Sequence, residues 1–209
     1  MKELIIATKN KGKIRDFEQL FSPFSIQVKS LLDIEGIEDI EETGSTFEEN
    51  AAIKAEAISN KFGVTVIADD SGLVVDALNG APGVYSARYA GEDKDDQANI
   101  EKVLSELQGT SEENRTARFV CVLAVSQPAK ETFFTRGECE GTIGYQVKGE
   151  HGFGYDPIFY PLNSRRTMAE MRPEEKNQIS HRKKSVRPVK EVGRTIIDTD
   201  MCCKGMKLC

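Results

Sequence analysis

The chain has 209 residues, of which 28 are lysine or arginine and 34 are aspartate or glutamate, for a formal net charge of −6. This acidic balance argues against a general nucleic-acid-binding surface, and charge-free runs such as 119–129 are much shorter than the about 20 residues that span a bilayer. An odd count of five cysteines and an N-terminus without a signal-peptide pattern favour a reduced, cytoplasmic protein.

Charge and cysteine are distributed unevenly along the chain. Residues 1–181 carry a net charge of −11, whereas residues 182–209 carry +5, from eight basic and three acidic residues. Three of the five cysteines also lie in this last segment. The C-terminal segment therefore differs in composition from the rest of the chain.

The first part of the sequence predicts two strands, each next to a helix. Residues 2–8 form a β-rich apolar run, residues 9–12 form a basic turn with a glycine, and apolar residues follow at helical spacing over 14–21. A capping box predicts a helix over 46–62. The apolar run 64–68 predicts a buried strand that ends in Asp69-Asp70-Ser71-Gly72, and Leu73 and Val75 continue an extended segment.

The second part of the sequence mixes helices with a β-meander. Apolar residues on one face predict a helix over 97–107, and alternating residues predict a strand over 116–126. Residues 131–147 contain strand-like pieces, residues 149–157 are rich in glycine, and we expect residues 167–180 to be helical. This mixture predicts an α/β or α+β fold with a mixed sheet.

The loop Thr8–Lys13 joins the first predicted strand to the first helix. Backbone N–H groups at a helix N-terminus attract anions, Lys9 and Lys13 add positive charge, and Thr8 and Asn10 can donate hydrogen bonds. The loop is either a phosphate-binding site or a polar connection with solvated lysines. It lacks the spacing of a Walker A motif.

Asp69 and Asp70 follow directly on the apolar strand, before Ser71 and Gly72. Adjacent buried carboxylates are costly unless they are solvated, paired or bound to a metal. Such a carboxylate could hold Mg²⁺ or deprotonate a water. The alternative is a turn capped by aspartate and serine.

Glu41 and Glu42 lie near the start of the helix predicted over 46–62, and Lys54 lies on that helix. One of the glutamates could supply a second carboxylate to a metal. A solvated acidic loop and an exposed lysine are the simpler interpretation when these residues are considered alone.

The segment Gly152–Pro157 places aromatic residues and Asp156 between glycines. The glycines permit close approach, a ring can stack on a base, and Asp156 could accept hydrogen bonds from a base or a sugar. The alternative is a turn whose aromatic residues cap the core.

Lys176, His181 and Arg182 belong to a basic stretch near the end of the last predicted helix. Lys176 could neutralise a phosphate, while His181 and Arg182 could donate to an oxygen acceptor. An ordinary basic helix end is the alternative. No partner at zinc-ligand spacing accompanies His181, and no motif for a covalent nucleophile is present.

Six segments, taken together, resemble one family, the nonstandard purine nucleoside triphosphate pyrophosphatases, also called the inosine/xanthosine triphosphate pyrophosphatases. They follow the order of that family between residues 1 and about 182, and they read IIATKNKGKIRDF, EETGSTFEENAAIKA, VIADDSGLVVDALNGAPGVYSARYAG, RTARFVCVLAV, GFGYDPIF and EKNQISHR.

The resemblance implies an α/β fold with two lobes, an elongated central mixed β-sheet, flanking helices and an active site in the cleft between the lobes. It implies a Mg²⁺-dependent hydrolase that cleaves ITP, dITP and XTP between the α- and β-phosphates. The products are a nucleoside monophosphate and pyrophosphate, so the enzyme clears these nucleotides from the pool. It also implies a homodimer, while the charge and the short apolar runs argue against nucleic-acid and membrane partners.

The resemblance assigns roles to individual residues. Asp70 is the expected proton acceptor and Mg²⁺ ligand, and Glu42, rather than Glu41, is the expected second metal ligand. Asp69 supports the site, Phe153 stacks on the base, and His181 and Arg182 read its 6-oxo group. The expected substrate-binding residues are Thr8, Lys9, Asn10, Lys11, Gly12, Lys13, Lys54, Ser71, Phe153, Gly154, Tyr155, Asp156, Lys176, His181 and Arg182.

The C-terminal segment departs from the family pattern. In the family a helix rich in alanine and leucine begins at the SHR motif, whereas here Lys183–Pro188 follows it, and a proline breaks or kinks a helix. We therefore expect a pyrophosphatase domain over 1–182 and an atypical, basic tail over 183–209 that is non-homologous, for example out of frame.

Two other functional classes compete with the pyrophosphatase. A non-catalytic nucleotide sensor would keep the cleft, but the Asp69-Asp70 pair argues against it. A pyrimidine-directed pyrophosphatase of the Maf-like group would carry a serine-rich, arginine-containing motif where this chain has TKNKGK.

Overall fold

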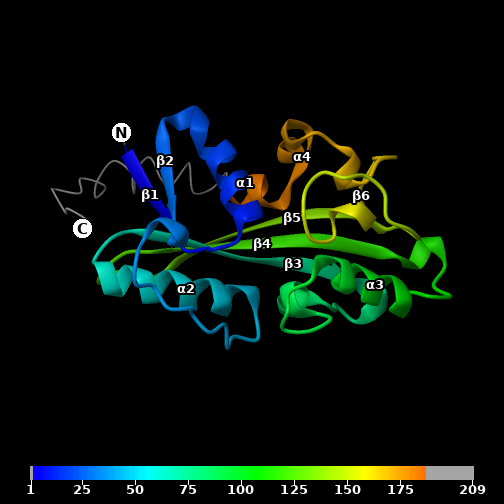
Figure 1. Ribbon diagram of the computed structural model, residues 1–209, viewed down its shortest axis with the longest axis horizontal. Helices are drawn as coiled ribbons and strands as arrows, with labels where there is room; N and C mark the ends of the chain where they lie inside the picture. Colours follow the sequence, from blue (N-terminus) through cyan, green and yellow to red (C-terminus); the bar gives the residue numbers. More distant parts are fainter. Residues whose placement is uncertain (1, 187–209) are drawn as a thin grey trace. The chain divides into compact units, whose positions relative to one another are not determined.

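The computed structural model describes residues 2–186, which form a six-stranded mixed sheet with the strand order β2-β1-β3-β4-β5-β6 (Figure 1). Strand β1 pairs in parallel with β2 and with β3, whereas β5 and β6 are antiparallel. The strands are β1 Lys2–Ile6, β2 Ile26–Ser30, β3 Val66–Val75, β4 Thr116–Ser126, β5 Phe133–Ile143 and β6 Phe159–Pro161.

The described residues divide into two compact units. Unit 1 contains residues 2–70, 122–136 and 185–186, and unit 2 contains residues 71–121 and 137–184. Strands β3, β4 and β5 each pass from one unit into the other. The α-helices are α1 Lys11–Phe21, α2 Phe47–Phe62, α3 Asp96–Glu106 and α4 Pro173–Ile179.

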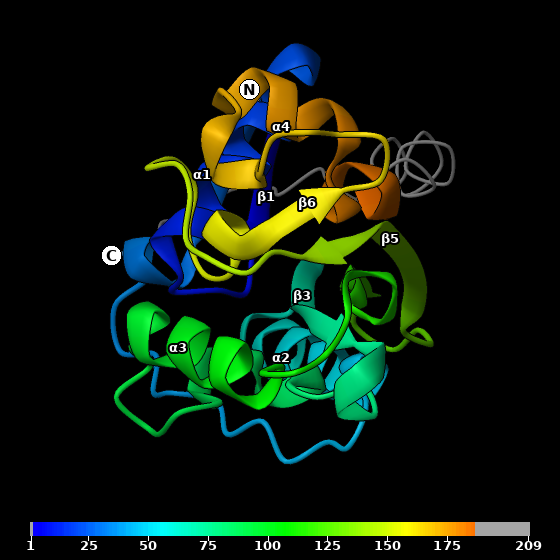
Figure 2. The same cartoon turned by 90° about the vertical axis from the view of Figure 1, so that its right-hand side faces the viewer.

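In unit 1, α1 and α2 lie on opposite sides of the strands (Figure 1, Figure 2). The buried face of α1 includes Phe17, Leu20 and Phe21. Helix α2 begins with the predicted capping box, in which the Thr46 hydroxyl accepts from the Glu49 amide and the Glu49 carboxylate accepts from the Thr46 amide. The local signals for both helices therefore predicted their positions correctly.

In unit 2, α3 and α4 lie on opposite sides of the strands (Figure 2). Helix α3 buries Ile100 and Val103 against a core to which β3 and β4 contribute. In this core the rings of Phe119 and Phe159 are tilted, with 4.6 Å between their centroids. Apolar residues of α3 and of the strands thus share one core, as the helical spacing over 97–107 predicted.

One expectation about secondary structure is wrong. Residues 167–180 form a 3-10 turn over Met168–Glu170 and a separate helix α4, because Met171 is extended and Pro173 starts the helix at its first position. Strand β3 passes through Asp69 and Asp70 and ends at Val75, so the extended segment expected at Leu73 and Val75 belongs to the same strand, and no capped turn interrupts it.

The expected tail begins inside the described region. Residues 181–186 are helical, and residues from 187 onward, including Pro188, lie outside the described residues. Among residues 2–186, no helix is both long enough and apolar enough to cross a membrane.

Candidate active site

A buried lysine in unit 1 contacts two carboxylates. Asp70 on β3 is 5% exposed and Lys54 on α2 is 8% exposed. The Lys54 Nζ lies 2.9 Å from the Glu42 Oε1 and 3.4 Å from the Asp70 Oδ1. One cation thus holds the two carboxylates together.

The charges of this cluster shift the pKa values of its members. Burial raises the pKa of Asp70, and the positive charges of Lys54 and Lys13 offset only part of that effect. Burial acts to lower the pKa of Lys54, but the carboxylates of Asp70 and Glu42 outweigh it, so this pKa is raised. Lys54 therefore stays charged at neutral pH, and Asp70 is a better proton acceptor than a solvated aspartate.

The structure distinguishes Glu42 from Glu41. Glu42 is partly buried against Lys54, whereas Glu41 is exposed. Glu42 and Asp70 offer hard oxygen ligands around one cationic group, a donor set that fits Mg²⁺, which often takes one or two carboxylates plus substrate phosphates. Residues 2–186 contain no group of three or more His, Cys, Asp or Glu side chains placed to hold a metal without a substrate.

Asp69 contacts a different lysine. Its Oδ2 lies 3.0 Å from the Nζ of Lys13 on α1. Consecutive side chains of a strand point to opposite faces, and α1 and α2 lie on opposite sides of the strands (Figure 1). Asp69 therefore orients Lys13 while Asp70 faces Lys54, so the two adjacent aspartates are both paired.

The loop Thr8–Lys13 makes more polar contacts within the protein than the sequence suggested. The Asn10 Oδ1 accepts from the amides of Gly12 and Lys13, at 2.8 and 3.0 Å, and caps α1. These two amides are therefore used by the helix cap, and phosphate binding by the loop stays a prediction. The Lys9 Nζ contacts Asp39 at 2.6 Å, Thr8 is buried, and Lys11 is exposed.

Asp156 and Lys176 form a buried ion pair in unit 2. The Asp156 Oδ2 accepts from the Lys176 Nζ at 2.6 Å and from the Phe153 amide at 2.9 Å. Gly152 permits this arrangement, because a Cβ there would lie 2.0 Å from the same oxygen. Asp156 therefore positions Lys176, and its expected contact with a base or a sugar stays a prediction.

The ring of Phe153 is flanked by two cations. The Lys176 Nζ lies 4.6 Å and the Arg182 Cζ 5.4 Å from its centroid, distances typical of cation–π contacts. A nitrogen of the Arg182 guanidinium donates to the Ser71 Oγ at 2.9 Å. Unit 2 therefore brings Phe153, Lys176, Arg182 and Ser71 together, and their contacts with a substrate stay predictions.

The other expected residues of this group have contacts within the protein. The Tyr155 hydroxyl donates to the carbonyl of Ser86 at 2.8 Å, and the Gly154 amide donates to the Asp96 Oδ2 at 2.8 Å. His181 is buried and stacks on Phe119, with 5.0 Å between the ring centroids. These contacts hold the segment around Phe153 and Arg182 in place.

The sequence alone did not single out Asn50. It is fully buried on α2, and its Nδ2 donates to the Asp70 Oδ2 at 3.3 Å. Its position four residues before Lys54 places both side chains on one face of a helix, which was the available signal.

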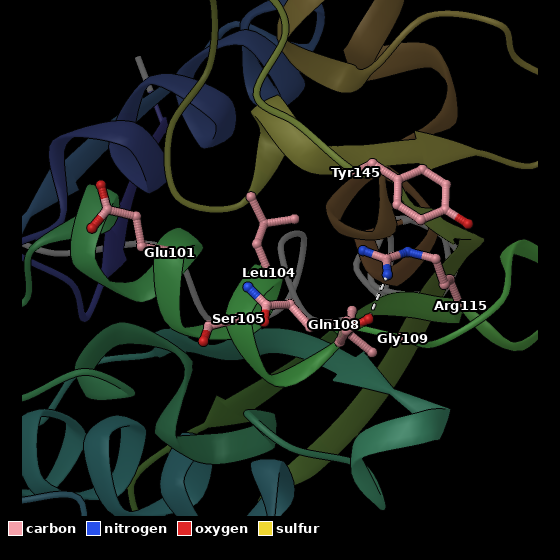
Figure 3. A pocket seen from close by; sticks show the side chains of 8 residues that line it. Glu101, Leu104, Ser105, Gln108, Gly109, Arg115 and Tyr145 are labelled. Carbon is pink, nitrogen blue, oxygen red and sulfur yellow. Dashed lines mark hydrogen bonds between the residues drawn. The ribbon is translucent and has the colours of Figure 1, made fainter.

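A separate cavity in unit 2 contains none of the expected substrate-binding residues. It measures about 410 Å³ and lies along α3 (Figure 3). Arg115 forms part of its wall and donates to the carbonyls of Leu107, Ile143 and Gly144, while the Tyr145 ring lies 4.4 Å from its guanidinium. Arg115 thus binds carbonyls at the end of α3, a structural role.

The fold and the two clusters define an α/β protein with paired carboxylates and lysines, a combination suited to a polyphosphate ligand. The model of the Ham1 family matches residues 4–192, and the chain belongs to this family.

Relatives and solved structures agree with this assignment. A dITP/XTP pyrophosphatase of Oceanobacillus iheyensis is 62% identical over 187 residues, which are 89% of this chain and 95% of the relative. The structure of the Staphylococcus aureus Ham1 protein has a TM-score of 0.82 and 49% identity, and that of a HAM1 protein from Coxiella burnetii has 0.83 and 41%. Each structure match covers 93% of this chain and 100% of the other.

These comparisons confirm the family resemblance and the α/β fold with a mixed sheet. The family match ends at residue 192, beyond the expected domain boundary at 182. The origin of the tail and the position of the active site in a cleft between lobes stay predictions.

Proposed function

We propose that this chain is a Mg²⁺-dependent hydrolase that converts ITP, dITP and XTP to the nucleoside monophosphate and pyrophosphate, and so removes nonstandard purine nucleotides. One observation carries the proposal: in a chain that is 62% identical to a dITP/XTP pyrophosphatase, a buried aspartate with a raised pKa lies beside a lysine and a second carboxylate. A buried carboxylate of this kind argues against a binding protein without catalysis.

Asp70 accepts the proton of the attacking water. The water oxygen forms the new bond to phosphorus while the bond between the α-phosphate and the β-phosphate breaks, and pyrophosphate leaves. Asp70 is buried and lies beside Lys54, so its carboxylate is held in place to take this proton. Lys13 and Lys54 supply positive charge for the phosphates, and phosphoryl transfer depends chiefly on such positioning and charge.

Glu42 and Asp70 hold Mg²⁺ in this proposal. When bound, the ion neutralises negative charge on the triphosphate and orients it. Lys54 contacts both carboxylates, so it keeps the two ligands close together before the ion arrives.

Phe153 and Arg182 recognise the base. The Phe153 ring stacks on the purine, and the Arg182 guanidinium donates to its 6-oxo group. Adenine presents a 6-amino donor at the same place, which leaves donors facing donors. An unpaired buried donor costs about 1–3 kcal/mol, which corresponds to about a 5- to 150-fold preference for the 6-oxo purines.

A nucleotide panel tests this function. Pyrophosphate release is measured from ITP, dITP, XTP, ATP and dCTP, with Mg²⁺ and with EDTA. We expect release from the first three nucleotides far above the other two, loss of activity in EDTA, and no activity in Asp70→Asn. Absence of pyrophosphate from ITP, dITP and XTP in the presence of Mg²⁺ would overturn the proposal, and equal release from dCTP would favour a pyrimidine-directed enzyme.

We further propose that the enzyme acts as a cytoplasmic homodimer. The thiol of Cys139 is buried and has no disulfide partner among the described residues, as expected in a reducing compartment. Sedimentation of the full chain tests the dimer, and a mass of one chain at micromolar concentration would contradict it.

A further inference from the structure

We infer that Asn50 is a positioning residue, which holds the carboxylate of Asp70 and the loop that carries Glu42 in a fixed arrangement. This inference rests on the function proposed above, in which Asp70 accepts the proton and Glu42 contributes to the Mg²⁺ site. Asn50 itself touches neither the nucleotide nor the reacting atoms in that proposal.

Both ends of the Asn50 carboxamide are used. The Nδ2 donates to the Asp70 Oδ2 at 3.3 Å, and the Oδ1 accepts from the Gly44 amide at 2.8 Å. Asp70 lies on β3, and Gly44 lies two residues after Glu42 in the loop before α2. One side chain therefore connects the proposed base to the loop of the proposed second metal ligand.

The two partners determine which way the carboxamide faces. A carboxylate needs a donor and a backbone amide needs an acceptor, so exchange of the Asn50 oxygen and nitrogen would place like groups against each other at both ends. Asparagine is among the few side chains of this size with one donor end and one acceptor end. Because Asn50 is 0% exposed, water cannot readily replace either contact.

Gly44 is required for the close approach of the loop to α2. A Cβ at Gly44 would lie 2.7 Å from the Asn50 Oδ1 and 2.6 Å from the Glu49 Cβ. The loop is thus packed directly on the first turns of α2, and the position of Glu42 depends on this packing.

Asn99 provides an internal comparison. Asn50 and Asn99 are both the fourth residue of a helix, α2 and α3, and both are buried. The Asn99 Oδ1 accepts from the Ala90 amide at 2.6 Å, and its Nδ2 donates to the Ala87 carbonyl at 3.2 Å. Asn99 therefore connects backbone to backbone, whereas Asn50 connects backbone to the carboxylate of Asp70. The difference between them isolates the contact with Asp70.

Matched substitutions test the inference. Asn50→Asp (N50D) keeps an acceptor for Gly44 but turns an oxygen toward Asp70, and Asn99→Asp (N99D) keeps the acceptor for Ala90 but turns an oxygen toward the Ala87 carbonyl. Steady-state pyrophosphate release from ITP at saturating Mg²⁺ gives kcat and KM for both variants and the wild type. Urea unfolding gives the stability of each.

The two variants should lose comparable stability but differ in catalysis. We expect N50D to lose about 100-fold in kcat, since a displacement of about 1 Å in a reacting group can cost this much, while its KM for ITP stays within about threefold of the wild type. N99D should keep its kcat within about threefold of the wild type. A purely structural role would move both variants equally and would not separate kcat from KM.

A second pair of variants keeps the inference testable if N50D or N99D does not fold. Asn50→Ala (N50A) and Asn99→Ala (N99A) remove both ends of each carboxamide without adding a charge, and the same split in kcat is expected. A kcat for folded N50D or N50A within about threefold of the wild type, or an equal loss in the Asn99 variants, overturns the inference alone. A wild-type chain that does not turn over ITP overturns the proposed function and this inference with it.

Discussion

Replacement of Asp156 by asparagine (D156N) leaves a buried lysine without its carboxylate. The side chains of Asp156 and Lys176 are 3% and 6% exposed, and 2.6 Å separates the Oδ2 from the Nζ. Removal of one partner of such a pair costs about 3–5 kcal/mol, because the remaining charge is buried without compensation. We expect the free energy of unfolding to fall by this amount, since asparagine keeps the size of the side chain and an acceptor for the Phe153 amide.

The double variant separates the charge from the shape of the side chain. Lys176→Met (K176M) removes the other charge, and the combination K176M/D156N removes both. Replacement of a whole buried pair is often nearly neutral, so the double variant should recover most of the stability that D156N loses. Urea unfolding of the wild type, both single variants and the double variant gives the coupling energy as a double-mutant cycle.

The cycle can refute the interpretation of Asp156. If D156N loses less than about 1 kcal/mol, a value typical of exposed pairs, then the pair does not stabilise unit 2. If the double variant is as unstable as the sum of the single variants, the two side chains act independently. Either result would contradict the stabilising role of this ion pair.

Three further predictions concern the same enzyme. Lys54→Met should reduce kcat by about 100-fold, because it removes a proposed phosphate contact and the cation that joins Glu42 to Asp70. Lys61→Met, at an exposed position of the same helix, should match the wild type in the same assay. Equal losses in the two variants would contradict the proposed role of Lys54. Arg182→Lys keeps the charge but loses the planar guanidinium, and we expect the ratio of kcat/KM for ITP over ATP to fall by about tenfold or more, with an unchanged ratio as the contrary result. Burial raises the pKa of the Cys139 thiol to about 11, from 9.0, so between these pH values the folded state keeps a proton that the unfolded state loses. The free energy of unfolding should therefore fall as pH rises from about 9 to about 11, by up to about 1.4 kcal/mol per pH unit. Cys139→Ala should lose this dependence, and identical pH curves for the variant and the wild type would show that another group is responsible.

Features with local signals could be predicted from the sequence. The capping box at Thr46 and the helical spacing of α1 and α3 depend on residues within one or two turns of each other. The mixed sheet could also be predicted, because a chain that combines strand–helix units with a β-meander forms a sheet of this kind. The grouping of site residues came from motifs that resemble the family, since no single motif was specific enough.

Features that depend on distant partners could not be predicted. Lys13 and Lys54 pair with Asp69 and Asp70 from two different helices, and no local pattern reveals these partners. The ion pair of Asp156 with Lys176 joins residues 20 positions apart, so Asp156 looked available for a ligand. Likewise, Asn10 caps α1 by accepting from two of the backbone amides that the sequence suggested for phosphate binding.

The identity of the reaction products tests the central claim most directly. Phosphorus NMR of ITP incubated with the full chain and Mg²⁺ distinguishes cleavage between the α- and β-phosphates from removal of the terminal phosphate. We predict that the resonances of ITP are replaced by those of IMP and pyrophosphate, and that Asp70→Asn leaves ITP intact. Formation of IDP and orthophosphate, or an equal rate with Asp70→Asn, would contradict the proposed reaction.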